Sequence, residues 1–279
     1  MQTRQLTEVF GYPIDNMTQE ALSHRANRLC PYFNVVPACT KDKKDDPLGA
    51  CSISDERGMV IICPVRFRED WLIVKDASQF FFPESNPSDV RVLKEVRLAD
   101  SLGSSAGNID YVLAFVDQAG RVADFGALEV QSVYISGNIN KAFRYYMENP
   151  SENCKPDAWQ GKSYRFAPDY LSSSRKRLAP QLIMKGGILH SWQKKTAIAV
   201  DKSFFQTLPS LETVAPQEAD IAWLVYDLKL DTVNNRYKLT NEETVYTKFE
   251  DALQTITTRE AGSLDNFVAK LQAKLKKAK

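Results

Sequence analysis

Hydrophobic and polar positions alternate along several stretches of the chain and divide it into strands and helices. Residues 110–116 (DYVLAFV) and 125–135 (FGALEVQSVYI) are rich in strand-forming residues and flank the turn sequence QAGR, which predicts an antiparallel hairpin. Further strands are predicted at MVIICPV, WLIVK, KTAIAV and DIAWLVYDLKLD. Helices are predicted at residues 18–29, 138–147, from 171 onward and at 263–279. The predicted class is mixed α/β.

The hairpin carries polar residues where a buried strand would be apolar. Glu129 and Gln131 are two residues apart, so in a strand both side chains point to one face. Asp110 begins the preceding strand, and antiparallel pairing would bring it beside Glu129. Two facing carboxylates in a core repel each other unless a proton or a cation compensates them. Mg²⁺ is the expected cation, because it takes oxygen ligands and supports phosphodiester hydrolysis. A sheet that exposes this face to solvent would have the same spacing.

Four cysteines share one turn-rich segment near the N-terminus: Cys30, Cys39, Cys51 and Cys63. Four thiolates suit a tetrahedral structural metal, iron or zinc. Their intervals lack the short C-x₂₋₄-C spacing typical of zinc sites, so buried cysteines without a metal are the alternative. Cys154 stands apart as an ordinary thiol. We therefore expect a loop-rich metal-binding subdomain over residues 1–70 and a second unit over residues 71–279.

Basic residues gather between Tyr170 and Val200, a segment with six Lys or Arg and no Asp or Glu. Arg175, Lys176 and Arg177 follow three serines at the expected start of a helix, a combination suited to phosphate groups. A solvated helix face is the alternative reading. Two further arginines, Arg66 and Arg68, follow the last of the four cysteines and are also candidates for DNA contact.

Composition excludes several other classes. The net charge of +1 provides no global attraction to nucleic acid or to a membrane, so any DNA contact must come from a local patch. No apolar run is long enough to span a membrane and the first residues lack the apolar core of a signal peptide, which predicts a cytoplasmic protein without membrane contact. The two histidines lie far apart in sequence, which disfavours a histidine base. PDAWQGKS lacks the first glycine of a P-loop, so no nucleotide cofactor is expected.

The segments RLCPYFN, VIICPVRF, NIDYVLAF and FGALEVQS, in this order and followed by the basic helix, resemble the NotI-like type II restriction endonucleases. The resemblance runs from about Phe10 to Trp223. It implies a PD-(D/E)xK nuclease core, with a central mixed sheet flanked by helices and a four-cysteine metal site. It also implies Mg²⁺-dependent cleavage of double-stranded DNA at a GC-rich palindrome by a homodimer.

Carried over residue by residue, Asp110, Glu129 and Gln131 match the active-site positions of this family, and Glu95 matches an upstream acid. Gln131 stands where the superfamily usually has a lysine, and an amide can hold a water molecule but supplies no positive charge. A non-catalytic DNA-binding module on a nuclease fold is therefore the alternative function. A nuclease of the same core without tight sequence specificity is a third.

Overall fold

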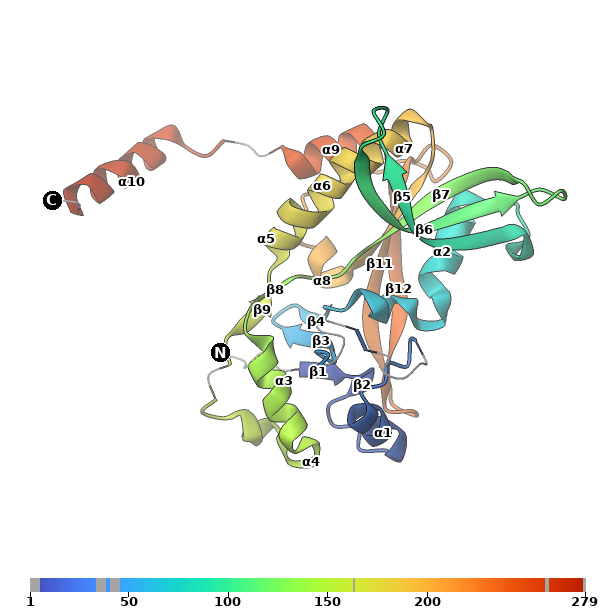
Figure 1. Ribbon diagram of the computed structural model, residues 1–279. Coiled ribbons are helices and arrows are strands. Elements are labelled where there is room, and N and C mark those ends of the chain that lie inside the picture. The colour runs from blue at the N-terminus through green and yellow to red at the C-terminus, as the bar shows by residue number, and fades with distance from the viewer. Residues whose placement is uncertain (1–5, 34–38, 41–45, 163, 259–260, 278–279) are drawn as a thin grey trace.

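A six-stranded mixed sheet forms the centre of the computed structural model (Figure 1), which describes residues 6–33, 39–40, 46–162, 164–258 and 261–277. The order of its strands is β12-β11-β10-β7-β6-β5. β10 runs parallel to both β7 and β11, and the other neighbours are antiparallel. The strands are β5 (Val90–Ala99), β6 (Ser105–Val116), β7 (Val122–Gln131), β10 (Thr196–Asp201), β11 (Ile221–Asp231) and β12 (Arg236–Thr247). This confirms the predicted class of a mixed central sheet flanked by helices.

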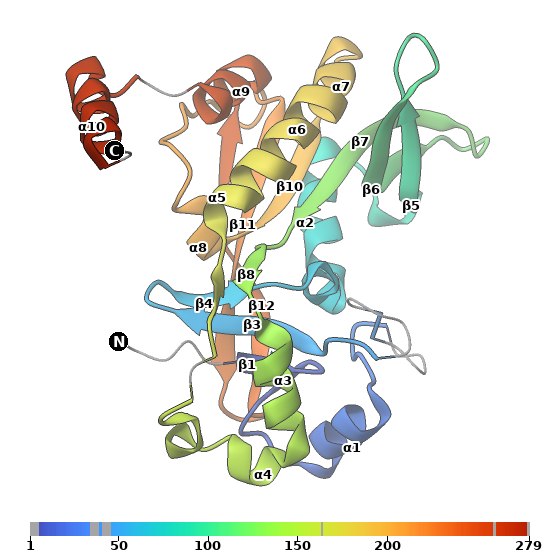
Figure 2. The same ribbon diagram turned by 60° about the vertical axis from the view of Figure 1, so that its left-hand side comes forward.

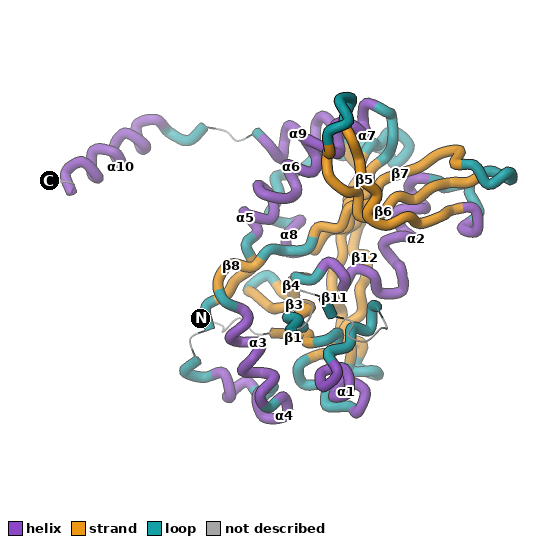
Figure 3. The backbone as a smooth tube through the Cα atoms, in the orientation of Figure 1, coloured by secondary structure: helices purple, strands orange, loops and turns teal. Residues whose placement is uncertain are grey.

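Helices cover both faces of this sheet (Figures 2 and 3). Successive residues of its central strands point to opposite sides, so an apolar strand presents apolar side chains on both faces. From β10, Ala197 and Ala199 belong to the apolar cluster that includes α2, whereas Ile198 and Val200 belong to the cluster on the other face. The helices concerned are α2 (Leu72–Phe81) on the first face and, on the second, the helical segment 170–191, α8 (Lys202–Phe205) and α9 (Phe249–Thr257). Burial on both faces explains the continuous apolar run of this strand.

The helical segment 170–191 contains two wider turns. It comprises α5 (Tyr170–Ser173), α6 (Ala179–Gln181) and α7 (Gly187–Ser191), joined by π-helical turns at Ser174–Leu178 and Leu182–Gly186. Pro180 lies inside this segment and has no N–H for the helical ladder, which is a common reason for such local irregularity. The buried residues Leu178 and Leu182 pack against the sheet, so the opposite side of the segment remains open to solvent.

A second sheet, of order β2-β1-β3-β4, is formed by the N-terminal part of the chain. Its strands are β1 (Leu6–Val9), β2 (Tyr12–Pro13), β3 (Ala50–Asp55) and β4 (Gly58–Ile61), and α1 (Gln19–Asn27) follows β2. The segment between Cys30 and Cys63, predicted to be dominated by loops, contributes β3 and β4, and its other described residues form turns and loops. Most apolar residues of this sheet belong to the same core cluster as one face of the central sheet, whereas Ile61 belongs to the cluster on the other face. The boundary at residue 70 stays a prediction.

The remaining elements complete the periphery. They are β8 (Ile135–Gly137), β9 (Phe166–Pro168), α3 (Ile139–Glu148), α4 (Pro150–Asn153), α10 (Leu264–Lys277) and the short helical turns Pro64–Trp71, Pro87–Asp89 and Pro156–Trp159. β8 and β9 pair with each other, and α10 lies apart from the rest of the chain in both views (Figures 1 and 2). Within the described residues, no helix has the length and apolar character needed to cross a membrane.

Two predictions of local structure had different outcomes. The hairpin around QAGR is confirmed, since β6 and β7 pair antiparallel on either side of that turn. WLIVK is helical instead of extended, as part of α2. Its short apolar run fits either structure, but the buried positions Ile73, Ala77 and Phe81 follow a four-residue spacing that is helical. β12 and α9 were not predicted. The residues of β12 are mostly half-buried and alternate weakly, whereas the buried positions Phe249, Ala252 and Ile256 of α9 follow a helical spacing that could have revealed it.

Candidate active site

Asp110 and Glu129 lie side by side on neighbouring strands of the central sheet. The pairing of Tyr111 with Leu128 sets the register, and the next residues along are Asp110 and Glu129. A side-chain oxygen of Asp110 accepts a hydrogen bond from the backbone N–H of Val130 at 2.8 Å. The hairpin therefore brings the two acids together, as the pairing around the turn predicted.

Glu95 joins this region from the third strand, β5. Its neighbours Lys94 and Val96 pair with Tyr111 and Ile109, so Glu95 lies opposite Asp110. The backbone of Glu95 has φ 53°, a left-handed conformation that is costly for a non-glycine residue inside a strand. The structure thus places acids from β5, β6 and β7 next to one another. Within the described part of the chain, however, no three Asp, Glu, Cys or His side chains are close enough to form a ready-made metal cage.

A cleft of about 410 Å³ opens over these strands. Three of the predicted active-site residues line it, Glu95, Asp110 and Gln131. Arg68 and Arg177 line it as well, although they come from the N-terminal part of the chain and from the helical segment 170–191. The cleft therefore combines acids and cationic side chains drawn from distant parts of the sequence.

Gln131, which the resemblance aligns with the usual lysine position, is buried. Its side-chain amide donates a hydrogen bond to the carbonyl oxygen of Ser132 at 3.0 Å. This bond turns the amide N–H toward the backbone of its own strand. Gln131 is therefore anchored at the wall of the cleft and adds no charge to it.

Lys185 is the residue that sequence reasoning missed. Its ammonium donates to Oε2 of Glu129 at 2.6 Å and to the backbone carbonyl of Asn108 at 2.9 Å. Both side chains of this ion pair are buried, with exposed fractions of 7% and 6%. The one available sequence signal was the absence of acids between Tyr170 and Val200, which leaves Lys185 without a partner on its own helix. The spacing of 56 residues hides the pair in the sequence.

Glu129 is held in an environment that disfavours its charged form. Its pKa is raised from 4.5 to about 8: burial is the main cause, the neighbouring Asp110 adds to the rise, and Lys185 opposes it. No N–H or O–H donor among the described residues reaches its other oxygen, Oε1, which is fully buried. An orphaned carboxylate oxygen beside a second acid is the donor set that a hard divalent cation requires. The residues present therefore fit Mg²⁺.

The predicted DNA-contacting residues fall into two groups. Arg175, Lys176 and Arg177 are exposed and lie in the first π-helical turn of the segment 170–191. The helix begins at Tyr170 with Asp169 as its N-cap, so the three serines lie in its first turns and the basic residues follow them, as the sequence predicts. Arg68 is half-buried and donates to the hydroxyl of Tyr111 at 2.6 Å. These four cations remain candidates for phosphate contact.

Arg66 does not belong with them. Its side chain has no exposed surface, and it forms ion pairs with Glu8 at 3.1 Å and with Glu69 at 2.6 Å. It also donates to the carbonyl oxygen of Tyr237 and lies over the ring of Tyr32. The expectation that Arg66 contacts DNA is wrong, because all of its donors are engaged inside the protein. Arg66 instead joins β1, β12 and the turn Pro64–Trp71.

The four cysteines line one cavity of about 190 Å³: Cys30, Cys39, Cys51 and Cys63. Burial raises the pKa of the Cys30 thiol to about 12, and the nearby Cys63 and Cys39 contribute to this rise. The sequence grouping is therefore also a spatial one. The described thiols do not, as they stand, meet in a group of three positioned to hold an ion. Cys154 lies elsewhere, between α4 and the turn Pro156–Trp159.

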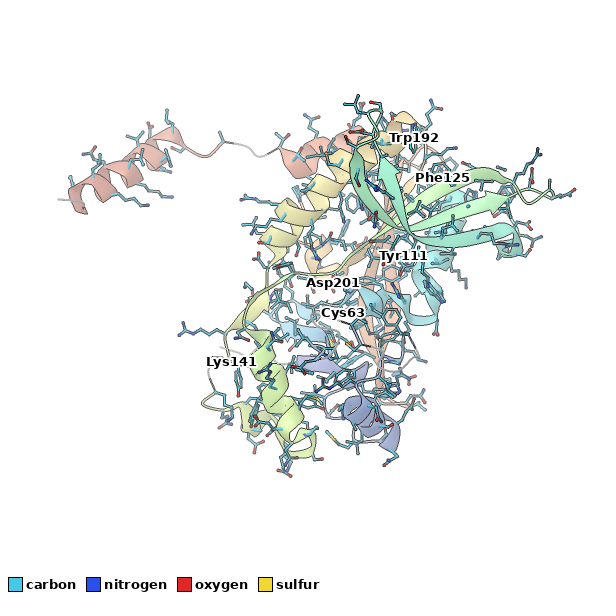
Figure 4. All side chains as sticks on the ribbon, viewed as in Figure 1. Cys63, Tyr111, Phe125, Lys141, Trp192 and Asp201 are labelled. Atoms are coloured by element: carbon cyan, nitrogen blue, oxygen red, sulfur yellow. The ribbon has the colours of Figure 1, made fainter. Side chains whose placement is uncertain are left out.

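The cysteine cavity and the acid-lined cleft share a wall. Four residues line both: Phe33, Thr40, Pro64 and Val65. Figure 4 shows Tyr111 at the base of the β5–β7 strands and Cys63 beside the N-terminal sheet. A change in the packing of the cysteine segment would therefore move one side of the cleft.

Comparison with known families gives one match of wide extent. The family model of the restriction endonuclease NotI matches residues 8–239. This range includes the acid pair, the cleft, Lys185 and the four cysteines. Among curated individual proteins, none matches the chain.

Proposed function

The chain belongs to the NotI restriction endonuclease family, and we propose that it is a type II enzyme that hydrolyses double-stranded DNA with Mg²⁺ at a GC-rich palindrome. Membership of the family supports site-specific cleavage of DNA. The observation that carries the finer proposal is the acid pair: Asp110 lines the cleft, and Glu129 is buried beside it with an oxygen that no described donor satisfies.

Asp110 and Glu129 would hold the metal, and Glu95 lies opposite Asp110 on the neighbouring strand β5. When bound there, Mg²⁺ would supply Lewis-acid chemistry and a more acidic water for attack on a phosphodiester. The chain itself restrains the acids: the backbone N–H of Val130 holds Asp110, and the ammonium of Lys185 holds Glu129. Gln131 is placed to contact a water molecule at the cleft wall.

The cationic side chains around the cleft would position the DNA backbone. Arg68 and Arg177 line the cleft itself, while Arg175 and Lys176 extend the same charge along the exposed side of the helix. Phosphate contacts of this kind set register and affinity, whereas base contacts set sequence specificity. A GC-rich palindrome is carried over from the family resemblance. A homodimer follows from that symmetry, since two strands must be cut and each chain offers one such acid pair among its described residues.

We also propose that Cys30, Cys39, Cys51 and Cys63 hold one iron or zinc ion, as the family resemblance implies. Their location around a single cavity supports this, and a closed four-thiolate site would stiffen the wall that the cavity shares with the cleft. Elemental analysis of the purified protein should find about one iron or zinc ion per chain. Cys30→Ser should release the metal and Cys154→Ser should retain it. A metal-free protein that cuts DNA normally would contradict this part of the proposal.

The proposal is tested by incubating the protein with DNA of known sequence in Mg²⁺ and mapping the ends of the products. Discrete fragments that share one end sequence are expected. A smear would indicate a nuclease without tight specificity.

The glutamine at position 131 favours one competing function, a non-catalytic DNA-binding module on the same fold. Sequence-specific binding without cleavage in either Mg²⁺ or Mn²⁺ would support that alternative and contradict the proposed enzyme.

A further inference from the structure

We propose that Lys185 is a positioning residue of this site: from the helix that covers the sheet, its ammonium holds Oε2 of Glu129 and provides the positive charge that Gln131 cannot. The inference rests on the proposed nuclease function. It adds to that function a residue that lies far from the acid-x-polar motif in sequence, on an element that the motif does not include.

The first support is the geometry of the contact. The ammonium of Lys185 is fixed from two sides, by a carboxylate at 2.6 Å and by the carbonyl of Asn108 at 2.9 Å. Asn108 lies two residues before Asp110 on β6, so Lys185 bridges the two strands that carry the acid pair. A side chain held in this way restricts the rotation of Glu129. The orientation of the Glu129 carboxylate therefore depends on the helix.

The second support is that the two oxygens of Glu129 differ in their hydrogen bonding. Oε2 is occupied by Lys185, and no donor among the described residues reaches Oε1. A lysine that only neutralised a buried acid would leave no reason for a second acid, Asp110, to lie beside Glu129. The arrangement leaves one oxygen and one acid available to a ligand.

The third support is the backbone around Lys185. It lies in the π-helical turn Leu182–Gly186, and such turns occur often at functional sites. Its side chain passes Gly107 on β6, where an added Cβ would lie 3.8 Å from its Cδ. The following residue, Gly186, allows the helix to approach Phe249, since an added Cβ there would lie 2.7 Å from the phenylalanine ring. Close packing on both sides fixes the path of the lysine into the sheet.

The test compares cleavage by the wild type, Lys185→Met, and Lys185→Met combined with Gln131→Lys. Lys185→Met should lower kcat by about 100-fold or more and leave the affinity for DNA within about threefold, because the acids and the phosphate contacts remain. A lysine at position 131 should restore at least about tenfold of this loss, since it returns an ammonium to the same acid pair from β7, the strand that carries Glu129, instead of from the helix. Restoration of this kind is not expected if Lys185 only stabilises the fold.

Lys194→Met is the matched control. Lys194 follows the same helical segment and forms a lysine–carboxylate pair of equal length with Asp124, 2.6 Å, but it does not line the cleft. Its cleavage should match the wild type. If Lys185→Met does not fold, Lys185→Gln replaces it, because glutamine keeps an N–H donor for Oε2 without a charge; the same loss of kcat is expected.

A readout independent of cleavage is the midpoint of thermal unfolding in Glu129→Gln, Lys185→Met and the double variant. Lys185→Met should lower the midpoint by roughly 5 °C or more, and the double variant should recover most of this, because the unpaired buried acid is gone.

Cleavage by Lys185→Met within threefold of the wild type would overturn the inference, as would a folded double variant with Gln131→Lys that regains nothing. Wild-type protein that binds DNA but never cuts it would contradict the proposed function instead. In that case, additive unfolding effects of Glu129→Gln and Lys185→Met would also overturn the inference, and strong coupling would support it.

Discussion

Two buried ion pairs, Arg66 with Glu8 and Lys185 with Glu129, stabilise different parts of the molecule and differ in how completely they are satisfied. Arg66 engages two carboxylates, a backbone carbonyl and an aromatic ring. Glu8, in turn, also accepts a hydrogen bond from Ser52 at 2.7 Å. Lys185 satisfies one oxygen of Glu129, while the other has no described donor and a second acid lies beside it.

The difference shows how to distinguish a structural pair from a functional one. A fully bonded buried pair has no capacity left for a ligand, so it serves the fold alone. A pair with an orphaned oxygen and a second acid beside it costs stability, and proteins retain such arrangements chiefly at functional sites. Mutations should therefore affect stability at Arg66 and chemistry at Glu129.

The largest effect on mutation is expected at the acid pair Asp110 and Glu129. Asp110→Asn should lower the cleavage rate by about 10⁴-fold, equivalent to about 5 kcal/mol in the barrier, because it removes a charged metal ligand. Stability should be unchanged or slightly raised, since the repulsion with Glu129 is relieved and an amide oxygen still accepts from Val130. Plasmid cleavage and denaturant unfolding measure the two. Wild-type activity in this variant would remove Asp110 from the site.

Mutation of the pair Arg66 and Glu8 should have the opposite effect, a loss of stability with little loss of cleavage. Arg66→Met should lower the free energy of unfolding by about 4 kcal/mol, because it leaves the buried Glu8 and the half-buried Glu69 without their partner. The folded fraction should cleave DNA at nearly the wild-type rate. Urea unfolding and cleavage assays at low temperature test this. A variant of wild-type stability that binds DNA poorly would return Arg66 to the DNA-contacting group.

Glu129 should also make the free energy of unfolding depend on pH. The pKa of Glu129 is raised from the ordinary 4.5 to about 8, so between these values the folded protein keeps a proton that the unfolded chain has released. Unfolding then releases a proton, and the free energy of unfolding falls as pH rises through this window, by up to about 1.4 kcal/mol per pH unit.

Glu129→Gln removes that contribution, so its stability curve should be flatter than that of the wild type between pH 5 and 8. Asp201, whose pKa burial raises to about 7, contributes a slope of the same sign to both proteins and cancels in the comparison. Denaturant unfolding at several pH values provides the measurement. Parallel curves would show that Glu129 does not hold its proton in the folded state.

The smallest effect is expected at the exposed cations, which contrast with both buried pairs. Replacing Arg175 and Arg177 together with alanine should reduce the slope of log affinity against log salt by about 1.8, for two lost phosphate contacts. Affinity at moderate salt should fall by roughly tenfold. Binding titrations at several salt concentrations measure this, with stability as the control. An unchanged slope would assign these residues to a solvated helix face.

Local pattern in the sequence determined the hairpin, the central strands and the proximity of Asp110 to Glu129. A two-residue period and a turn signal act over a few residues, and antiparallel pairing around a short turn brings residues at equal distances from it together. The grouping of the four cysteines was likewise visible, because they fall within 34 residues of chain and line one cavity.

Tertiary structure alone decided the partners of the charged residues. Lys185 and Arg66 were both basic residues near apolar runs, and the sequence offered no sign that one would reach an acid 56 residues away and the other one 58 residues away. The helical form of WLIVK was decided in the same way, by the face of the sheet that α2 covers. Pairings of this kind depend on which elements pack together and at what angle. The packing that forms is the one that leaves the least unpaired charge buried and the least apolar surface exposed over the whole chain. The spacing of residues within one segment carries no information about this total.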